Sequence, residues 1–270
     1  MESTVANRLG RVNVMVRNRV SSYVHRMDYC DSQLYEPHCN TVYEILFILK
    51  GSVNFELEGE HVLMQENSGI VIEPLQFQVL SGNEDAYHRI LLFFSLEMIP
   101  PAIQEAFAER IKRYYVFSSP AMIDLFHQYA ELVEKKDDTY QALKDALFTQ
   151  IAYTIALDGS IEKKLRMNVK TEKLRQIIDY IDRNINTDIR VEDIADEMHM
   201  SLSTAYRLFK EEMHISLKQY IMQKKMMCAR SMLQQGMAPC DVAAAIGYRN
   251  YPSFYRMYVK IIGKPPCKSV

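Results

Sequence analysis

Apolar and polar positions follow two different patterns along this chain, and the pattern changes near residue 96. Before that point, short runs rich in Val, Ile, Leu and Phe alternate with turn-forming residues such as Gly51 and Gly59. These runs predict strands at 42–49, 52–57, 62–64, 69–72, 77–80 and 89–95. Short strands at close, even spacing favour an antiparallel barrel or sandwich. We expect Pro100 and Pro101 to end this β-rich region.

Two helices are predicted next, because apolar residues recur there at every third or fourth position. The residues with this spacing are Met122, Leu125, Phe126, Tyr129 and Val133 in the first helix and Leu143, Leu147, Ile151 and Ile155 in the second. Such stripes either pack against their own domain or form a subunit interface. We interpret them as a dimerisation segment, because a stripe beside a small barrel leaves spare apolar surface. The charged stretch at 161–170 is predicted to be an exposed linker.

The last hundred residues contain one arrangement twice: a short helix, a three-residue turn and a second short helix, at 191–213 and 239–262. A longer helix at 216–235 joins the two copies. In the second helix of each copy, apolar residues such as Phe209 and Phe254 fall on the inner face. The outward positions, which we predict to bind DNA, are Ser203, Thr204, Tyr206, Arg207, Lys210, Tyr251, Ser253, Tyr255, Arg256 and Lys260.

The arginines and lysines among these outward positions suit a DNA ligand. Residues near the start of such a helix reach base edges in the major groove, and an arginine can bind guanine through two hydrogen bonds. Lys210, at the far end of its helix, is better placed to bind a phosphate. A single helix pair would also fit ordinary bundle packing. Two copies with equivalent Arg and Lys positions favour DNA binding, with Arg207 and Arg256 held about 34 Å apart, one turn of duplex.

Charge is divided along the chain in the same way. Residues 1–160 contain 13 Lys and Arg against 22 Asp and Glu, whereas residues 161–270 contain 19 against 12. The net charge of −2 hides this division. Only the second part therefore carries the excess positive charge that phosphates attract, unless the division is a chance result of solvated faces.

The C-terminal pattern resembles the DNA-binding domain of the AraC/XylS family of bacterial transcription regulators, over residues 171–266. The residues that carry the resemblance are Val191 to Ala195, Ser201 to Lys210, Ser216, Tyr220, Ala229, Leu233, Ile246 to Tyr248, Asn250, Ser253, Phe254, Arg256, Lys260 and Gly263 to Pro265. The resemblance implies that both second helices enter successive major grooves.

The chain departs from that family at a few positions. His199 and His214 stand where the family usually has Gly, and a non-Gly residue at positive φ is strained. Arg190 and Ala238 replace the usual capping Ser or Thr, which should weaken each helix cap by about 1 kcal/mol. Lys225 replaces a usual Arg on the joining helix. We therefore expect a looser first helix pair, in which the two His residues act either as spacers or as a pH sensor.

In the front half, His38, Asn40 and Glu44 follow the spacing of the first cupin motif, in which His, His and Glu ligate a metal. Asn40 replaces the second His, and the segment from Gly69 to Gln78 lacks the later His, so we predict no metal site. Residues 30–96 nevertheless resemble the ligand-sensing cupin barrel that often precedes this DNA-binding domain.

Inward polar residues of this barrel are predicted to bind a small polar effector such as a sugar. These residues are His38, Asn40, Glu44 and Gln78. The alternative is a closed barrel in which the same polar groups satisfy one another.

The sequence contains no arrangement typical of catalysis. It has no Gly-x-Ser-x-Gly, no Ser with a His and Asp context and no phosphate-cradling loop, so we expect neither catalytic residues nor a cofactor. Five cysteines without a CxxC pair favour reduced thiols, with a redox pair of Cys30 and Cys39 as the alternative. Neither a secretory signal nor an apolar run of bilayer length is present, so we expect a soluble cytoplasmic protein without a membrane partner.

The sequence thus predicts an α+β protein with three parts. A cupin-like antiparallel β-barrel at 1–98 precedes a helical dimerisation segment at 99–160 and an all-α tandem helix–turn–helix domain at 161–270. The expected function is sequence-specific transcription regulation by a homodimer. Its expected partners are double-stranded promoter DNA, a small-molecule effector and RNA polymerase. The alternatives are a regulator without an effector and a metal-dependent cupin enzyme fused to a DNA-binding domain.

Overall fold

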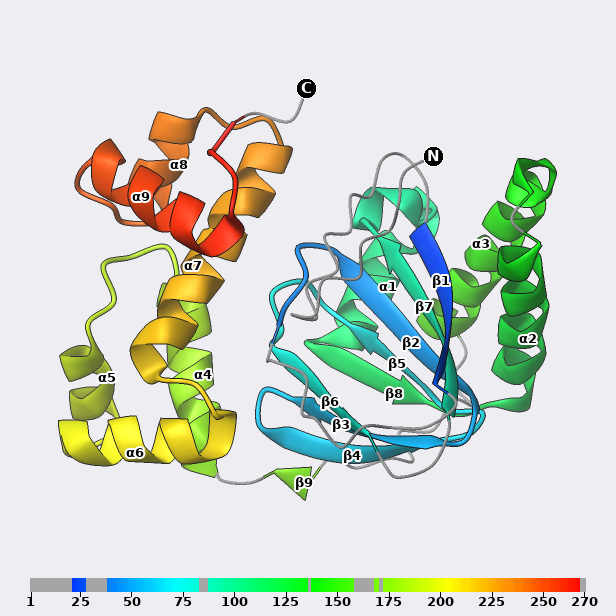
Figure 1. The fold of residues 1–270 in the computed structure, drawn as a ribbon, viewed down its shortest axis with the longest axis horizontal. Helices are drawn as coiled ribbons and strands as arrows, with labels where there is room; N and C mark the ends of the chain where they lie inside the picture. The colour runs from blue at the N-terminus through cyan, green and yellow to red at the C-terminus, as the bar shows by residue number, and fades with distance from the viewer. Residues whose placement is uncertain are drawn as a thin grey trace. The chain divides into compact units, whose positions relative to one another are not determined.

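The computed structural model describes residues 21–27, 38–82, 87–135, 137–157, 168–169 and 172–267. These residues fold as two compact units (Figure 1). The first unit contains Met1–Leu57 and His61–Asn168, and the second contains Glu58–Glu60 and Val169–Val270. The expected succession of antiparallel sheets followed by a helical domain is confirmed.

Two sheets form the β-rich part of the first unit. The five-stranded sheet has the order β1 (Ser21–Met27), β7 (Tyr87–Phe94), β2 (Tyr43–Lys50), β5 (Gly69–Ile72) and β8 (Tyr114–Phe117). The four-stranded sheet has the order β6 (Gln78–Gly82), β3 (Ser52–Leu57), β4 (Glu60–Gln65) and β9 (Asn168–Val169). The central strand β2 pairs antiparallel with both β5 and β7.

Side-chain alternation along β2 explains how the first unit is assembled. Residues 43–48 are all buried, as expected for a strand that is covered on both faces. Ile45 and Phe47 belong to one apolar core, whereas Leu46 and Ile48 belong to another. Residues from both sheets fill this second core, so the two sheets pack face to face.

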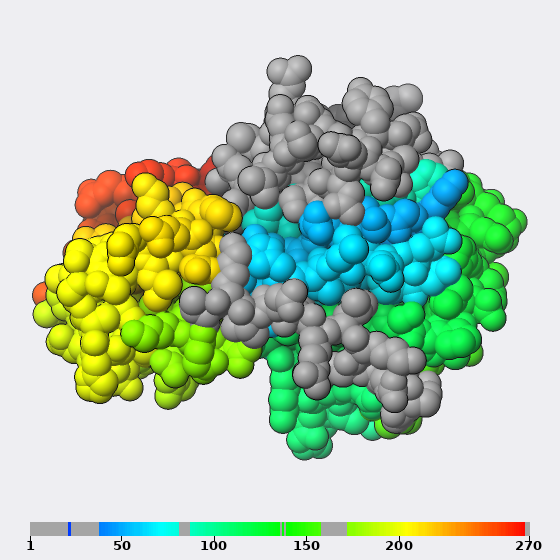
Figure 2. Space-filling view, turned by 90° about the horizontal axis from the view of Figure 1, so that it is seen from below, coloured from blue at the N-terminus to red at the C-terminus, as the bar shows by residue number. Residues whose placement is uncertain are grey.

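Helices cover the other face of the five-stranded sheet (Figure 1) and fill the first core. In Figure 2 the helical residues of this unit, in green, lie beside its β-rich residues, in blue and cyan. The helical elements are the 3-10 helices Leu96–Met98, Pro101–Ile103 and Asp138–Tyr140, and the α-helices α1 (Gln104–Ile111), α2 (Pro120–Glu134) and α3 (Gln141–Leu157). The Phe126 ring of α2 stacks on Phe47 of β2 with 4.4 Å between ring centroids. Both predicted apolar stripes therefore pack mainly within their own unit, although Leu143 remains 51% exposed.

The β-rich region does not end at Pro100 and Pro101, contrary to the expectation from the sequence. After α1, strand β8 returns to the five-stranded sheet and pairs antiparallel with β5. Lys112 and Arg113 have positive φ angles of 33° and 81° and reverse the chain between these two elements. Strand β1 was also not predicted. The predicted linker at 161–170 lies outside the described residues except for β9.

The second unit consists mainly of six helices among its described residues. They are α4 (Glu172–Asn184), α5 (Val191–Glu197), α6 (Leu202–Met213), α7 (Leu217–Gln234), α8 (Pro239–Ala245) and α9 (Tyr251–Ile262). We call α5 and α6 the first pair, α8 and α9 the second pair, and α7 the joining helix. Residues 198–201 separate the first pair and 246–250 the second, so the second turn is one residue longer, where equal turns were expected.

The two pairs share one backbone geometry at their turns. His199 and His214 have positive φ angles of 51° and 58°, and Gly247 and Gly263 at the equivalent places both have 80°. The strain expected in the first pair is therefore confirmed. No helix among the described residues is long and apolar enough to cross a bilayer.

Candidate DNA-reading helices and effector site

Each pair presents its second helix in the same way. Ser201 caps α6 by accepting a hydrogen bond from the Thr204 backbone N–H at 3.2 Å. Asn250 caps α9 by accepting one from the Ser253 backbone N–H at 3.0 Å. These side chains satisfy an otherwise unpaired N–H in the first turn and fix where each helix begins.

Apolar residues hold both helices from the inner side. On α6, Ala205 and Phe209 are buried, and the Phe209 ring meets Tyr220 of the joining helix with 5.0 Å between centroids. On α9, Phe254 and Tyr258 belong to a core that also contains Met226, Ala229 and Leu233 of the joining helix. The joining helix therefore packs against the second helix of both pairs.

Arg207 and Arg256 occupy equivalent, exposed positions, as the sequence predicted. Each lies six residues after its capping residue, on the opposite side of the helix from the buried phenylalanine. Arg256 Nη2 lies 3.4 Å from Ser253 Oγ and donates to it across one helical turn. Neither guanidinium makes another hydrogen bond or ion pair with the described residues, so most of their donors can bind a ligand.

The other predicted DNA contacts are more varied. Tyr255 is exposed, and Tyr206, at the equivalent place, is half-buried with Lys218 Nζ 5.8 Å from its ring centroid. The hydroxyls of Ser203 and Thr204 lie within 2.9 Å and 2.8 Å of Ser201 Oγ, so they belong to the cap of α6. Tyr251 is half-buried against Phe254.

The two lysines are exposed but not equivalent, which corrects the expectation from the sequence. At the end of α6, the His214 N–H bonds to the Lys210 carbonyl, whereas at the end of α9 the Gly263 N–H bonds to the Val259 carbonyl. Lys210 therefore corresponds to Val259, and Lys260 lies one residue further on. Because one residue rotates a helix by about 100°, the two lysines leave their helices in different directions.

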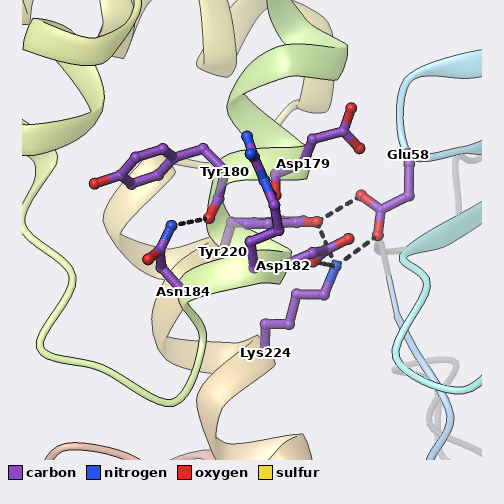
Figure 3. Close-up of polar contacts among 8 residues, drawn as sticks. Glu58, Asp179, Tyr180, Asp182, Asn184, Tyr220 and Lys224 are labelled. Carbon is purple, nitrogen blue, oxygen red and sulfur yellow. Dashed lines mark hydrogen bonds and ion pairs between the residues drawn. The ribbon is translucent and has the colours of Figure 1, made fainter.

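The joining helix carries two consecutive buried lysines that sequence reasoning did not assign. Lys224 Nζ lies 2.5 Å from Asp182 Oδ1 of α4, 3.3 Å from Glu58 Oε1 and 3.0 Å from the Tyr220 hydroxyl (Figure 3). The Tyr220 hydroxyl in turn donates to Glu58 Oε2 at 2.6 Å. The two carboxylates and the hydroxyl compensate the buried ammonium, which would otherwise be costly to desolvate.

Lys225 points to a different part of the second unit. Its ammonium donates to the backbone carbonyls of Thr187 and Ile246, at 2.9 Å for Ile246. Burial lowers the pKa of Lys225, an effect that nearby Asp188 opposes. The only sequence signal was a departure from the family's Arg, because backbone carbonyls as partners leave no trace in the sequence.

The structure brings together the four residues of the predicted effector site. Glu44 and Gln78 are almost fully buried. Glu44 Oε2 accepts hydrogen bonds from Asn40 Nδ2 at 2.7 Å and from Gln78 Nε2 at 2.5 Å. His38 and Gln78 also pair through their backbones, and their side-chain nitrogens lie 3.5 Å apart. Much of this network satisfies itself, as the closed-barrel alternative expects.

Two buried side-chain acceptors in the segment that contains Gln78 remain without a partner. The Oε1 atoms of Gln76 and Gln78 are buried and accept no hydrogen bond from the described residues. A buried acceptor of this kind is unfavourable unless something donates to it. Among the described residues, no group of three His, Cys, Asp or Glu side chains is placed to hold a metal ion.

Four of the cysteines lie in the described part of the chain. Cys228, Cys240 and Cys267 are free thiols, and Cys39 is the fourth cysteine in this part of the chain. The possible redox partner Cys30 lies outside the described residues.

Comparison with known proteins agrees with the architecture of the second unit. Residues 194–268 match a family model described as a helix-turn-helix domain. The probable transcriptional regulator LumQ of Photobacterium leiognathi is 23% identical over 231 residues, which cover 83% of this chain and 88% of LumQ. The lactose operon transcription activator of Staphylococcus xylosus is 23% identical over 140 residues, but the match spans only 50% of that protein and 52% of this chain.

Among solved structures, the apo ToxT variant of Vibrio cholerae aligns with 91% of this chain and 95% of its own. Its sequence identity is 13% and the TM-score is 0.41, which is too low to support a shared fold.

Two helix–turn–helix pairs and the match to this domain define a DNA-binding protein. The comparisons agree with the resemblance seen in the sequence: residues 194–268 match a helix-turn-helix domain, and the relatives above are named as transcription regulators. LumQ and the lactose operon activator are both named as transcription regulators, which favours a regulator over the alternative of a cupin enzyme.

Proposed function

We propose that α6 and α9 read neighbouring major grooves of one promoter site, with Arg207 and Arg256 each binding a guanine. The observation that carries this proposal is the equivalent, exposed placement of these two arginines, six residues after the helix cap in both pairs. An arginine at such a position can reach O6 and N7 of guanine together. Tyr206 and Tyr255, at matching positions, would contact bases or sugars next to them.

The remaining polar positions are proposed to hold the helices on the backbone. Lys210 and Lys260 are exposed near the C-terminal ends of α6 and α9 and would bind phosphates on differently placed strands. The hydroxyls of Ser203, Thr204 and Ser253, and the half-buried Tyr251, would contact the phosphate backbone near the start of each helix. Such contacts fix orientation without selecting a sequence.

The test begins with duplexes selected from a random DNA library by the full chain. Arg207→Ala and Arg256→Ala should each weaken binding to the selected duplex by about 1–3 kcal/mol and relax the preference at one base pair, measured by fluorescence anisotropy. Lys210→Ala should weaken binding to all duplexes alike. It should also reduce the slope of log Kd against log salt concentration by about one, because one phosphate contact is lost. Lys173→Ala on α4 removes an exposed charge elsewhere and serves as the control. Failure to retain any duplex at low salt, or unchanged preferences in both arginine variants, would refute the proposal.

We further propose that the polar network around Glu44 binds a small polar effector such as a sugar. Its support is the unpartnered Gln78 Oε1 beside Asn40, Glu44 and His38, which offers an acceptor to a ligand hydroxyl. A relative that is named as a lactose operon activator agrees with this class of ligand. A sugar would have to displace part of the present network, so its hydroxyls would replace the bonds made by Asn40 and Gln78.

Thermal denaturation with a panel of sugars tests the effector proposal. A bound sugar should raise the Tm in proportion to its concentration relative to its Kd. Asn40→Ala should reduce this shift, whereas Leu63→Ala on the exposed side of β4 should preserve it. A panel without any stabilising sugar would favour the alternative, in which the first unit regulates without a small-molecule effector.

Dimerisation is proposed to use α3. Leu143, Tyr153 and Leu157 are 51%, 38% and 61% exposed and fall within an arc of about 80° on that helix. Leu157→Glu should lower dimer formation in sedimentation equilibrium, whereas Leu63→Glu should not. Effector binding would change how the first unit and α3 hold the two DNA-binding units of a dimer. This change would shift which DNA half-sites the dimer occupies and thereby alter the recruitment of RNA polymerase. The free energy available for the shift is limited to the difference in effector affinity between the two arrangements of the dimer.

A further inference from the structure

Lys225 connects two stretches of backbone that are distant in the sequence. It lies in the middle of the joining helix and is 8% exposed. Its ammonium donates to the Thr187 carbonyl in the loop between α4 and α5, and to the Ile246 carbonyl at the end of α8. One side chain therefore links the loop that enters the first pair to the turn of the second pair. We refer to Lys225, Thr187, Ile246 and Gly247 as the Lys225 joint.

The loop side of this joint is itself anchored. The backbone N–H and the hydroxyl of Thr187 both lie 2.8 Å from the Asn184 carbonyl at the end of α4 and donate to it. The Ile189 N–H also bonds to the Thr187 carbonyl, at 3.0 Å. The loop thus has little freedom to move away from the lysine.

Gly247 brings the second pair into direct backbone contact with the same loop. A Cβ atom at this position would lie 2.8 Å from the Thr187 carbonyl carbon and 3.0 Å from the Asp188 nitrogen. These distances are shorter than side-chain carbons tolerate, so the close approach depends on the missing side chain. The carbonyls that Lys225 binds lie at this contact.

Other interactions along this seam are weaker. Arg249 and Asp188 form an ion pair at 3.6 Å, but their side chains are 81% and 60% exposed, and such pairs contribute little. A cleft of about 470 Å³, lined by residues that include Met222 and Tyr248, opens beside the joint. Apolar packing therefore does not fill the seam next to Lys225.

We propose that the Lys225 joint fixes the placement of α6 relative to α9 and thereby sets the number of base pairs between the two half-sites that one chain binds. Lys225 acts as a positioning residue, because it bonds to protein carbonyls and not to DNA. The inference rests on the proposed reading of DNA by both helices. Each added base pair moves a half-site along the duplex and rotates it around the axis, so a fixed joint accepts one spacing.

The experiment uses the full chain and its selected duplex, together with duplexes that have one base pair inserted or removed between the half-sites. Wild-type protein should lose at least about tenfold in affinity for the altered spacings, because one helix loses its base contacts. Lys225→Met keeps the length of the side chain but removes the donor, and should reduce this discrimination to about twofold or less. Lys225→Arg restores donors and should restore the discrimination. Lys173→Met, which removes an exposed charge from α4, is the matched control and should discriminate as the wild type does.

The outcomes separate the possible failures. If wild-type protein binds the selected duplex but accepts all spacings equally, the role of the joint is refuted while DNA reading stands, and no variant is needed for that conclusion. If no duplex is bound, the proposed function itself fails. A folded Lys225→Met variant, judged by its circular dichroism, that keeps full spacing discrimination also overturns the inference.

Discussion

The two helix pairs of the second unit have the same backbone conformation at two equivalent positions, but different residues adopt it. Both have a left-handed residue at the turn and another after the second helix, because that conformation ends one helix and redirects the chain. The second pair uses Gly247 and Gly263 there, whereas the first uses His199 and His214. Both histidines are exposed, so no burial compensates for their strain. The fold thus dictates the backbone conformation at these positions, and the residue there sets only the free energy of adopting it.

The glycines themselves differ, and this gives the largest expected effect. Gly247→Ala should lower the free energy of opening of the second pair by about 2–4 kcal/mol, from left-handed strain and a clash with the Thr187 backbone. Gly263→Ala has the same φ but nothing within 4 Å of the added Cβ. Its loss should be limited to the strain, about 1 kcal/mol. Hydrogen exchange of peptides from α8 and α9 in the full chain measures both, and equal losses would contradict the importance of the Thr187 contact.

In the first pair the opposite substitution, from histidine to glycine, should remove strain and not add it. His214→Gly should raise the free energy of opening of α5 and α6 by about 1 kcal/mol, because glycine adopts this φ without a Cβ clash. His214→Ala keeps the Cβ and should give no such gain. The same exchange measurement, now on peptides of the first pair, distinguishes them. A gain in the alanine variant would mean that the imidazole, and not the backbone, is responsible for the strain.

The smallest effect is expected at a feature that the two pairs share. Neither α5 nor α8 has a side-chain cap, because Arg190 and Ala238 occupy the capping positions. Both residues have extended backbones, so Arg190→Ser and Ala238→Ser should each add about 0.5–1 kcal/mol to the stability of their own pair. Arg190→Lys is the control without a cap. If either Arg190→Ser or Ala238→Ser stabilised both pairs equally, the two pairs would unfold together as one cooperative unit, contrary to this expectation.

The sequence predicted this half of the molecule well because its signals are local. Apolar spacing, the helix caps and the exposed Arg207 and Arg256 all depend on residues within one or two turns. The Lys225 joint could not be predicted, since its partners are backbone carbonyls at Thr187 and Ile246, which any residue would supply. A lysine on a helix also resembles a solvated position until its surroundings are known.

Long-range pairing explains what was missed in the first unit. Strands β2 to β7 were predicted close to their true ends, but β8 is short and follows two prolines and a helix, so nothing nearby marks it as a strand. The stripe on α3 contains a real apolar face, and its sequence does not reveal whether the sheet or a second subunit covers it. The structure does bring His38, Asn40, Glu44 and Gln78 together, but only Glu44 and Gln78 lie in strands, and these strands belong to different sheets. The sequence spacing does not reveal whether these residues bind a ligand. The feature that supports a ligand, the unpartnered Gln78 Oε1, is visible only in the structure.

The late return of β8 has a practical consequence for anyone who divides this chain. β8 is an edge strand and covers β5, whose four residues are apolar and fully buried. A fragment that stops at residue 98, where the barrel was expected to end, would uncover the Ile70–Ile72 side of the sheet. An uncovered apolar edge recruits strands from other molecules, so such a fragment should precipitate where a longer one, retaining Tyr114–Phe117, stays in solution.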